Sequence, residues 1–233
     1  MSSVPVGPLP PHGAPSRAVP AISFRERAAR LTPHAKRAMD IAIAGLALAL
    51  ALPFFLLVAL LVRADGGPAF YAHPRVGRGG RVFGCLKFRS MVVDSEARLE
   101  ALLAADPAAR AEWEQTRKLR NDPRITPIGR ILRATSLDEL PQLINVLKGE
   151  MSLVGPRPVT QAELDRYYGA AAAHYLSVRP GITGLWQVSG RSETSYDQRV
   201  ALDVAYVSQP SLLADLRILL KTPLAVLSRR GAR

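Results

Sequence analysis

Two adjacent carboxylates, Asp138 and Glu139, stand in the stretch Ser136-Leu137-Asp138-Glu139, directly before an apolar run. An ionised aspartate can attack phosphorus and form a covalent intermediate. Two neighbouring carboxylates can also share a magnesium ion with substrate phosphates. The same four residues match the S-x-x-E capping box, so two acids that merely begin a helix are the simpler alternative. At a helix N-terminus, the helix dipole would favour the ionised form of both acids.

Arginines lie close to this pair in the sequence, and a guanidinium fork suits phosphate oxygens because it can make two hydrogen bonds at once. Arg130 and Arg133 precede the carboxylates, and Arg157 lies between Pro156 and Pro158. The two prolines restrict the backbone, so they would present this fork at low entropic cost. The region therefore suits a phosphorylated substrate.

Lys87 and Arg89 add two cations in a strand-like stretch, where side-chain alternation places both on one face and Phe88 on the other. Charges that protect an exposed edge strand are the alternative explanation. Further along, Arg179 opens a glycine-rich stretch that ends at Gln187. Its glycines would allow a nucleotide to approach the backbone closely, although a tight structural turn would need them too.

Short elements must position these motifs. The pattern predicts strands at 69–72 and 82–88 around a loop rich in glycine and arginine, and helices at 95–105, 107–119, 162–178, 196–207 and 212–227. In the last helix the leucines fall along one face, and Asp215 is expected mostly outside that face. That helix could pack on the core or lie on a membrane surface, and packing is the commoner arrangement.

Residues 41–62 form a 22-residue apolar segment without a charge, long enough to cross a hydrocarbon core as a helix. Both flanks are basic, whereas a spanning helix usually carries its positive charge on one side. Pro53 lies near the middle and should kink the helix. The residues alone leave a spanning helix and a re-entrant helix equally open. Asp40 is expected to pair with Lys36 or Arg37, because an unpaired carboxylate at the membrane entrance is costly.

The 233 residues are enough for one domain with a substantial core. A formal charge of +12 favours anionic partners such as nucleic acid, an acidic membrane face or phosphorylated substrates. The single cysteine, Cys85, excludes an internal disulfide and is interpreted as a buried, inert thiol. Residues 1–24 contain six prolines and no apolar signal-peptide core, so they are interpreted as a disordered tail.

The region 36–188 resembles the bacterial sugar transferases, the monotopic polyprenyl-phosphate phosphoglycosyl transferases. The motifs stand in the family's order: Lys36-Arg37-x-x-Asp40, the apolar segment with Pro53, Lys87-Phe88-Arg89-Ser90-Met91, Ser136-Leu137-Asp138-Glu139-Leu140-Pro141-Gln142-Leu143, Gly155-Pro156-Arg157-Pro158 and Arg179-Pro180-Gly181-Ile182-Thr183-Gly184. Several separate motifs in the correct order make this resemblance specific. The C-terminal part looks most like the exopolysaccharide-initiating galactose- or glucose-1-phosphate transferases that act on undecaprenyl phosphate.

The resemblance implies a mostly helical α+β fold with a re-entrant membrane helix hairpin kinked at Pro53. It implies a disordered proline-rich tail at 1–34, the membrane helix at 35–63, and a cytosol-facing catalytic domain with amphipathic interfacial helices at 64–233. The expected location is the inner membrane of a bacterium. Lys36, Arg37 and Asp40 would be structural residues at the membrane entrance.

The resemblance also implies a mechanism. Asp138 would attack the β-phosphorus of a UDP-sugar, release UMP and form a covalent intermediate that undecaprenyl phosphate then attacks. Mg²⁺ would be held at Asp138 and Glu139. The residues assigned to phosphate or substrate binding are Lys87, Arg89, Arg133, Arg157 and Arg179. Membrane phospholipid and a further copy of the chain are additional expected partners, and nucleic acid is not.

The chain departs from the family at Leu52, where the family often has serine before the kink proline. Proline leaves one backbone carbonyl of the helix without its hydrogen-bond donor. With leucine in place of serine, no hydroxyl at this position can compensate for that loss. Larger relatives carry a four-helix membrane bundle before this region, and we expect the shorter catalytic unit to suffice. Two other functions are open: a membrane-anchored basic protein that binds anionic lipid or nucleic acid, and an ordinary glycosyltransferase that releases UDP. The sequence has no D-x-D triplet, which argues mildly against the second.

Overall fold

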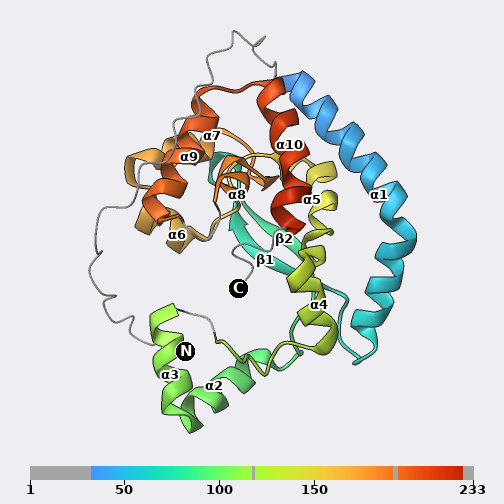
Figure 1. The fold of residues 1–233 in the computed structure, drawn as a ribbon, viewed down its shortest axis with the longest axis vertical. Helices are drawn as coiled ribbons and strands as arrows, with labels where there is room; N and C mark the ends of the chain where they lie inside the picture. The colour runs from blue at the N-terminus through green and yellow to red at the C-terminus, as the bar shows by residue number, and fades with distance from the viewer. Residues whose placement is uncertain (1–32, 117–118, 191–193, 228–233) are drawn as a thin grey trace. The chain divides into compact units, whose positions relative to one another are not determined.

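A computed structural model describes residues 33–116, 119–190 and 194–227 (Figure 1). The predicted proline-rich tail therefore lies almost wholly outside the described residues. By their contacts, residues 93–124 form a small unit separate from the larger unit of residues 33–92 and 125–227. The small unit contains two helices, α2 (Ser95–Ala105) and α3 (Pro107–Thr116). Asp106 accepts hydrogen bonds from the first backbone amides of α3, as the break predicted at Asp106-Pro107 requires.

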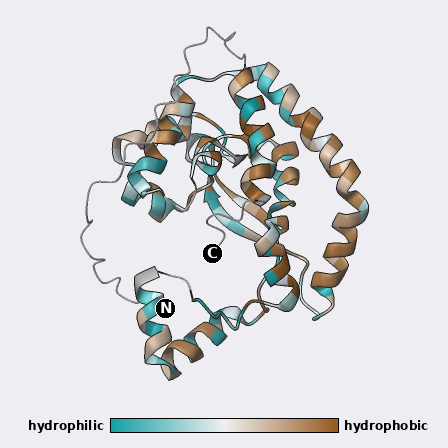
Figure 2. Cartoon of the chain, viewed as in Figure 1, coloured by the Kyte–Doolittle hydropathy of each residue, from teal (hydrophilic) through white to brown (hydrophobic). Residues whose placement is uncertain are grey.

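The larger unit begins with α1 (Pro33–Arg63), a single continuous helix with Pro53 inside it. Of the helices in the described ranges, it alone is long and apolar enough to cross a membrane, and only 17% of its apolar window is buried. In Figure 2 most of α1 has the brown colour of hydrophobic residues. A core helix of a soluble protein would be mostly buried, so α1 presents an apolar face to its surroundings. The re-entrant arrangement itself stays a prediction.

The N-terminal end of α1 is tied to the larger unit by a cluster that we call the α1 anchor: Lys36, Arg37, Asp40 and Asp215. Lys36 Nζ lies 2.6 Å from Asp215 Oδ2, and Arg37 donates to the backbone oxygens of Val146 and Leu147. Asp40 accepts from the backbone amide of Leu153 at 3.0 Å. The predicted pairing of Asp40 with Lys36 or Arg37 is therefore wrong, because both cations have other partners.

Two antiparallel strands, β1 (Phe70–Val76) and β2 (Val82–Phe88), form a hairpin after α1. The turn needs glycine, since Gly79 and Gly80 have φ values of 68° and 80°. β1 is longer than predicted and includes Pro74, which a two-stranded hairpin tolerates because each strand is an edge. Phe88 packs against α1, with its ring 4.9 Å from that of Phe55.

The remainder of the larger unit is mostly helical. A short parallel pair, β3 (Ser152–Val154) and β4 (Gly181–Thr183), lies among the helices. The helical elements are α4 (Pro127–Thr135), η2 (Leu137–Glu139), α5 (Gln142–Lys148), α6 (Gln161–Tyr167), η3 (Gly169–Ala171), α7 (Ala172–Ser177), α8 (Leu185–Ser189), α9 (Tyr196–Ser208) and α10 (Leu212–Leu227). The helix predicted at 162–178 is broken at Gly169, whose φ is 44°. A mostly helical α+β fold is confirmed.

The leucine face of α10 is mostly exposed rather than packed on the core, and Asp215 lies outside this face, as predicted. Asp215 is 1% exposed and lies in the α1 anchor, whereas Leu220 is 76% exposed. The other exposed leucines of α10 are Leu212, Leu213, Leu216 and Leu224. The buried ion pair with Lys36 turns the helix, so its polar residue faces inward and its leucines face outward. α10 therefore adds apolar surface to that of α1.

Candidate active site

Asp138 and Glu139 lie in η2, a single turn between α4 and α5. Ser136 begins this turn with a φ of 58°, a left-handed conformation that no other described residue except glycine adopts. Its side chain makes no capping hydrogen bond, so the capping-box explanation is wrong at this position. True capping boxes occur at Thr160 and Ser195 instead. The carboxylates therefore have no evident structural task as helix caps.

Lys87 at the end of β2 brings its ammonium group to both carboxylates. Its Nζ lies 2.7 Å from Glu139 Oε1 and 3.5 Å from Asp138 Oδ2. Phe88 points to the opposite face and is buried, as strand alternation predicts. The Asp138 side chain is 12% exposed and that of Lys87 is 26% exposed, so the group remains accessible at its edge.

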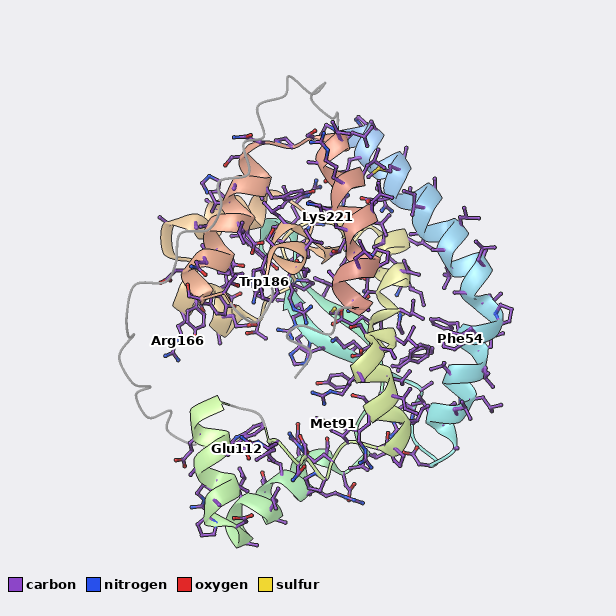
Figure 3. All side chains as sticks on the ribbon, in the orientation of Figure 1. Phe54, Met91, Glu112, Arg166, Trp186 and Lys221 are labelled. Carbon is purple, nitrogen blue, oxygen red and sulfur yellow. The ribbon has the colours of Figure 1, made fainter. Side chains whose placement is uncertain are left out.

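Arg157 reaches Glu139 from the loop after β3. Its Nη2 lies 3.3 Å from Glu139 Oε1. Arg199 supports this loop, because it donates to the backbone oxygen of Arg157 and its guanidinium lies 4.7 Å from the ring centre of Trp186. Trp186 itself lies on α8, beside α9 (Figure 3). Asp138, Glu139, Lys87 and Arg157 thus come together from three separate segments, and we call this group the carboxylate site.

The pKa values of the two acids are shifted in opposite directions. Burial raises the pKa of Asp138, and the repulsion of Glu139 adds to this, while the charge of Lys87 opposes it. Burial also disfavours ionised Glu139, but the charges of Arg157 and Lys87 outweigh it and lower its pKa to about 2. The helix dipole alone predicts ionisation of both acids, so it misses this asymmetry. Glu139 is a fixed anion, and Asp138 is the more basic of the two carboxylates.

Asn145 positions the site, and the sequence analysis did not single it out. Its amide donates to the backbone oxygen of Gly84 and its Oδ1 accepts from the amide of Leu86, so it ties α5 to β2. These bonds hold Lys87 beside the η2 turn. The signal in the sequence is a lone polar residue in the apolar run of α5, where a buried side-chain amide must find partners.

The other predicted phosphate-binding residues lie apart from this contact group. Arg89 uses all five N–H groups within the protein: it donates to Asp65 and to the backbone oxygens of Val62, Pro68 and Met91. It anchors the C-terminal end of α1, and the structure does not bring it to the carboxylates. Arg133 is exposed and acts on Asp138 through its charge.

Arg179 and its glycines have a packing role. Arg179 donates to the backbone oxygen of Gly149 at 2.6 Å. A Cβ atom on Gly181 would lie 2.1 Å from the backbone nitrogen of Gly155, and one on Gly184 would lie 2.2 Å from the oxygen of Gly155. Glycine is required because two backbones touch. Close contact between these two segments, rather than a nucleotide cradle or a tight turn, explains these glycines.

The residues present fit a magnesium ion that is shared with substrate phosphates. No group of three or more metal-binding side chains occurs in the part of the chain that the structure describes. Mg²⁺ commonly needs only one or two carboxylates besides phosphates and water. The ammonium group of Lys87 already lies within 3.5 Å of both carboxylates, so the pair can hold a cation. Cys85 cannot assist, because it is buried and burial raises its pKa to about 11.

Comparisons with known proteins show the family to which the chain belongs. The sequence model of the bacterial sugar transferase family matches residues 31–229. The undecaprenyl-phosphate galactose phosphotransferase of Salmonella typhimurium is 54% identical over 205 residues, which cover 88% of this chain and 43% of that protein. The exopolysaccharide production protein ExoY of Sinorhizobium fredii is 54% identical over 198 residues, covering 84% of this chain and 87% of ExoY.

A more distant relative is the UDP-glucose:undecaprenyl-phosphate glucose-1-phosphate transferase of Caulobacter vibrioides, 42% identical over 206 residues that cover 84% of this chain and 71% of that protein. The chain spans about two fifths of the length of several larger relatives. The family match includes both α1 and the carboxylate site, so the resemblance seen in the motifs is confirmed. This chain belongs to the bacterial sugar transferase family.

Proposed function

We propose that the protein transfers a hexose-1-phosphate, either galactose or glucose, from a UDP-sugar to undecaprenyl phosphate at the inner membrane, and so initiates exopolysaccharide synthesis. The observation that carries this proposal is the carboxylate site: one basic aspartate beside a fixed anion, with a lysine at both carboxylates and an arginine at Glu139. The names of the relatives support the two substrates and both sugars.

The chemistry follows from the four side chains. A carboxylate oxygen of Asp138 attacks the β-phosphorus of the donor, the bond from that phosphorus to the bridging oxygen breaks, and UMP leaves with the bond's electron pair. A phosphate oxygen of the lipid then attacks the same phosphorus, and the bond to Asp138 breaks. Lys87 and Arg157 would orient the phosphates, because their charges lie at the carboxylates. Lys87 also favours ionised Asp138 against the effect of burial.

A magnesium ion would be held by Asp138 and Glu139 together with phosphate oxygens of the donor. When bound, it supplies positive charge that offsets the negative charge of the diphosphate. The low pKa of Glu139 keeps one carboxylate available for the ion across the neutral range. Arg89 has no part in this proposal, since its donors are occupied.

The membrane part of the proposal is a re-entrant α1 that enters one leaflet from the cytosolic side. The helix has 31 residues and its buried residues are spread along it, from Asp40 to Val62. The larger unit therefore packs beside α1 along most of its length. A spanning orientation would carry that unit's polar residues into the hydrocarbon core, which is costly. The exposed leucines of α10 fit the same leaflet.

The test is the nucleotide that the purified protein releases from a UDP-sugar in the presence of Mg²⁺ and undecaprenyl phosphate. We expect UMP, and a hexose-phosphate adduct on Asp138 that mass spectrometry detects when the lipid is left out. The variant Asp138→Asn should lower UMP release about a thousandfold or more, whereas Asp165→Asn, an exposed control on α6, should not. Release of UDP would indicate an ordinary glycosyltransferase. No release with any donor would favour the membrane-anchored binding protein.

A further inference from the structure

A second polar site lies away from the carboxylate site. A hollow of about 500 Å³ is lined by the hairpin turn, the end of α5 and the residue that precedes β4. Four of its residues are cations, Arg78, Arg81, Lys148 and Arg179, and one is an acid, Glu150. We call this group the basic hollow. Its excess of positive charge needs an explanation, because like charges that face one another destabilise a folded chain.

The cations of the basic hollow are largely unneutralised. Arg78, Arg81 and Lys148 are exposed, and within the described part of the chain their side chains make no hydrogen bond or ion pair. Glu150 is engaged elsewhere, since its Oε2 accepts from Asn145 at 2.6 Å. Burial lowers the pKa of Arg179, and the charges of Arg78 and Arg37 lower it further. An anion in the hollow would relieve this repulsion.

The hollow is built on fixed backbone. Gly149 ends α5 with a φ of 83°, and Arg179 binds its backbone oxygen. Arg37, from the first turns of α1, donates to the carbonyl oxygens of Val146 and Leu147 at the same end of α5. The hollow is therefore next to the N-terminal end of α1, where a helix that enters a leaflet meets the lipid headgroups.

The basic hollow and the carboxylate site lie at opposite ends of the hairpin. Arg81 is at the turn, and Lys87 is six residues along, near the end of β2. Six residues of strand extend about 20 Å. A phosphate bound at the hollow is therefore too far away to be the phosphate that Asp138 attacks, and the hollow is a site of its own.

The lining favours a lipid over a nucleotide. The one aromatic residue in the lining is Phe83. A Cβ atom placed on Gly77 would lie 3.2 Å from the Phe83 ring, so the hairpin turn covers part of that ring. Val82, also in the lining, is 65% exposed. A cationic hollow with an exposed apolar rim suits a phosphodiester that is attached to acyl chains.

We propose that the basic hollow binds the headgroup phosphate of an anionic phospholipid and thereby sets the depth of α1 in the leaflet. The inference rests on the membrane location in the proposed function, but not on the transfer reaction. The charge complementarity and the position beside the start of α1 support the phospholipid as the occupant. Inorganic phosphate, a nucleotide and the lipid-linked substrate are outcomes that the experiment separates.

The experiment measures lipid binding to the full chain in a neutral detergent by native mass spectrometry. The probes are dihexanoyl phosphatidylglycerol and, as a lipid without net charge, dihexanoyl phosphatidylcholine. The test variant is Arg78→Gln with Arg81→Gln. The control is Arg98→Gln with Arg166→Gln, which removes the same charge from exposed positions on α2 and α6; Figure 3 shows Arg166 extending from α6.

We expect the wild type to bind phosphatidylglycerol about tenfold more tightly than phosphatidylcholine, since each cation near an anionic lipid contributes several-fold. The test variant should lose this preference and the control should keep it. Equal preference in the two double variants would overturn the proposal. So would displacement of the bound lipid by millimolar inorganic phosphate or UDP, because the hollow would then be a site for free phosphate.

A second readout separates the hollow from substrate binding. The KM values for the UDP-sugar and for undecaprenyl phosphate, measured in the same detergent, should stay within about twofold in the test variant. A rise in either KM without a change in lipid preference would assign the hollow to that substrate and refute the phospholipid. If neither the wild type nor any variant releases UMP, the transfer reaction is refuted. The lipid measurement still decides whether the basic hollow binds a phospholipid.

Discussion

The carboxylate site and the α1 anchor contain the same types of residue, yet their surroundings differ. In each, a lysine lies against an aspartate: Lys87 Nζ is 3.5 Å from Asp138, and Lys36 Nζ is 2.6 Å from Asp215. Asp215 is 1% exposed and also accepts from Tyr206. Burial raises the pKa of both aspartates, so Asp138 differs from Asp215 in its longer contact and its exposed edge.

The difference shows how to tell a structural charge cluster from a reactive one. In the α1 anchor each carboxylate has a short bond to a protein donor, and Arg37 is bound to two carbonyl oxygens. Such groups have little capacity left for a ligand. In the carboxylate site two cations share one oxygen of Glu139, so several donors and acceptors stay available for phosphates and a metal ion.

The strongest test of the comparison replaces the lysine of the carboxylate site. Lys87→Met removes a cation from the place where phosphate charge is expected, so kcat/KM should fall about a hundredfold to a thousandfold. The melting temperature should change little, because the Lys87 side chain is partly exposed. Steady-state UMP release and thermal unfolding measure the two effects. A large loss of stability with normal kcat/KM would mean that Lys87 is structural.

Arg89 tests whether contacts identify a structural charge, because its motif predicts phosphate binding while its contacts resemble those of the α1 anchor. Arg89→Lys cannot replace all five donated hydrogen bonds. We expect the free energy of unfolding to fall by about 3 kcal/mol, with kcat/KM per folded molecule nearly unchanged. Denaturant unfolding and activity corrected for the folded fraction measure this. A selective rise in the KM for the UDP-sugar would restore Arg89 to phosphate binding.

Lys36→Met is the matched counterpart of Lys87→Met. It leaves Asp215 buried without its cation, so stability should fall by about 2 kcal/mol, less than for a fully buried pair because Lys36 is 24% exposed. The kcat of the folded fraction should stay the same. Denaturant unfolding and UMP release, measured on one preparation, check both expectations. A catalytic defect with normal stability would contradict the structural role of the α1 anchor.

Asp203 extends the comparison to a buried carboxylate that a neutral hydroxyl binds. Burial raises its pKa to about 6 from an ordinary value of 3.8, and Tyr168 donates to it at 2.8 Å. The folded state holds the proton more tightly than the unfolded state, so stability is greatest below pH 4 and falls as the pH rises through about 6.

The measurement for Asp203 compares the wild type with Asp203→Asn, which cannot titrate. Between pH 5 and pH 8 the wild type should lose about 1 kcal/mol of stability relative to this variant. Thermal unfolding at four pH values detects the change. The exposed variant Asp197→Asn should show no such difference, and a wild-type curve parallel to that of Asp203→Asn would refute the raised pKa.

Local pattern was sufficient for much of the fold. The hairpin with its glycine-rich turn and the break at Asp106 follow from turn glycines, caps and strand alternation, which depend on near neighbours in sequence. The pairing of Asp138 with Glu139 and the presence of phosphate-binding cations were visible in the same way. The motif order also placed the chain in its family, because each motif is local.

Only the tertiary structure decided what each charge does. Arg89 and Lys87 are two residues apart and look alike in sequence, but Arg89 is enclosed by the end of α1 while Lys87 reaches the η2 turn. Asp215 lies outside the leucine face of its helix, as predicted, but only the structure shows that a lysine 179 residues away holds it buried. The energy of a charge depends on burial and on the distance to other charges. Both are set by segments far apart in the chain, so no local pattern contains them.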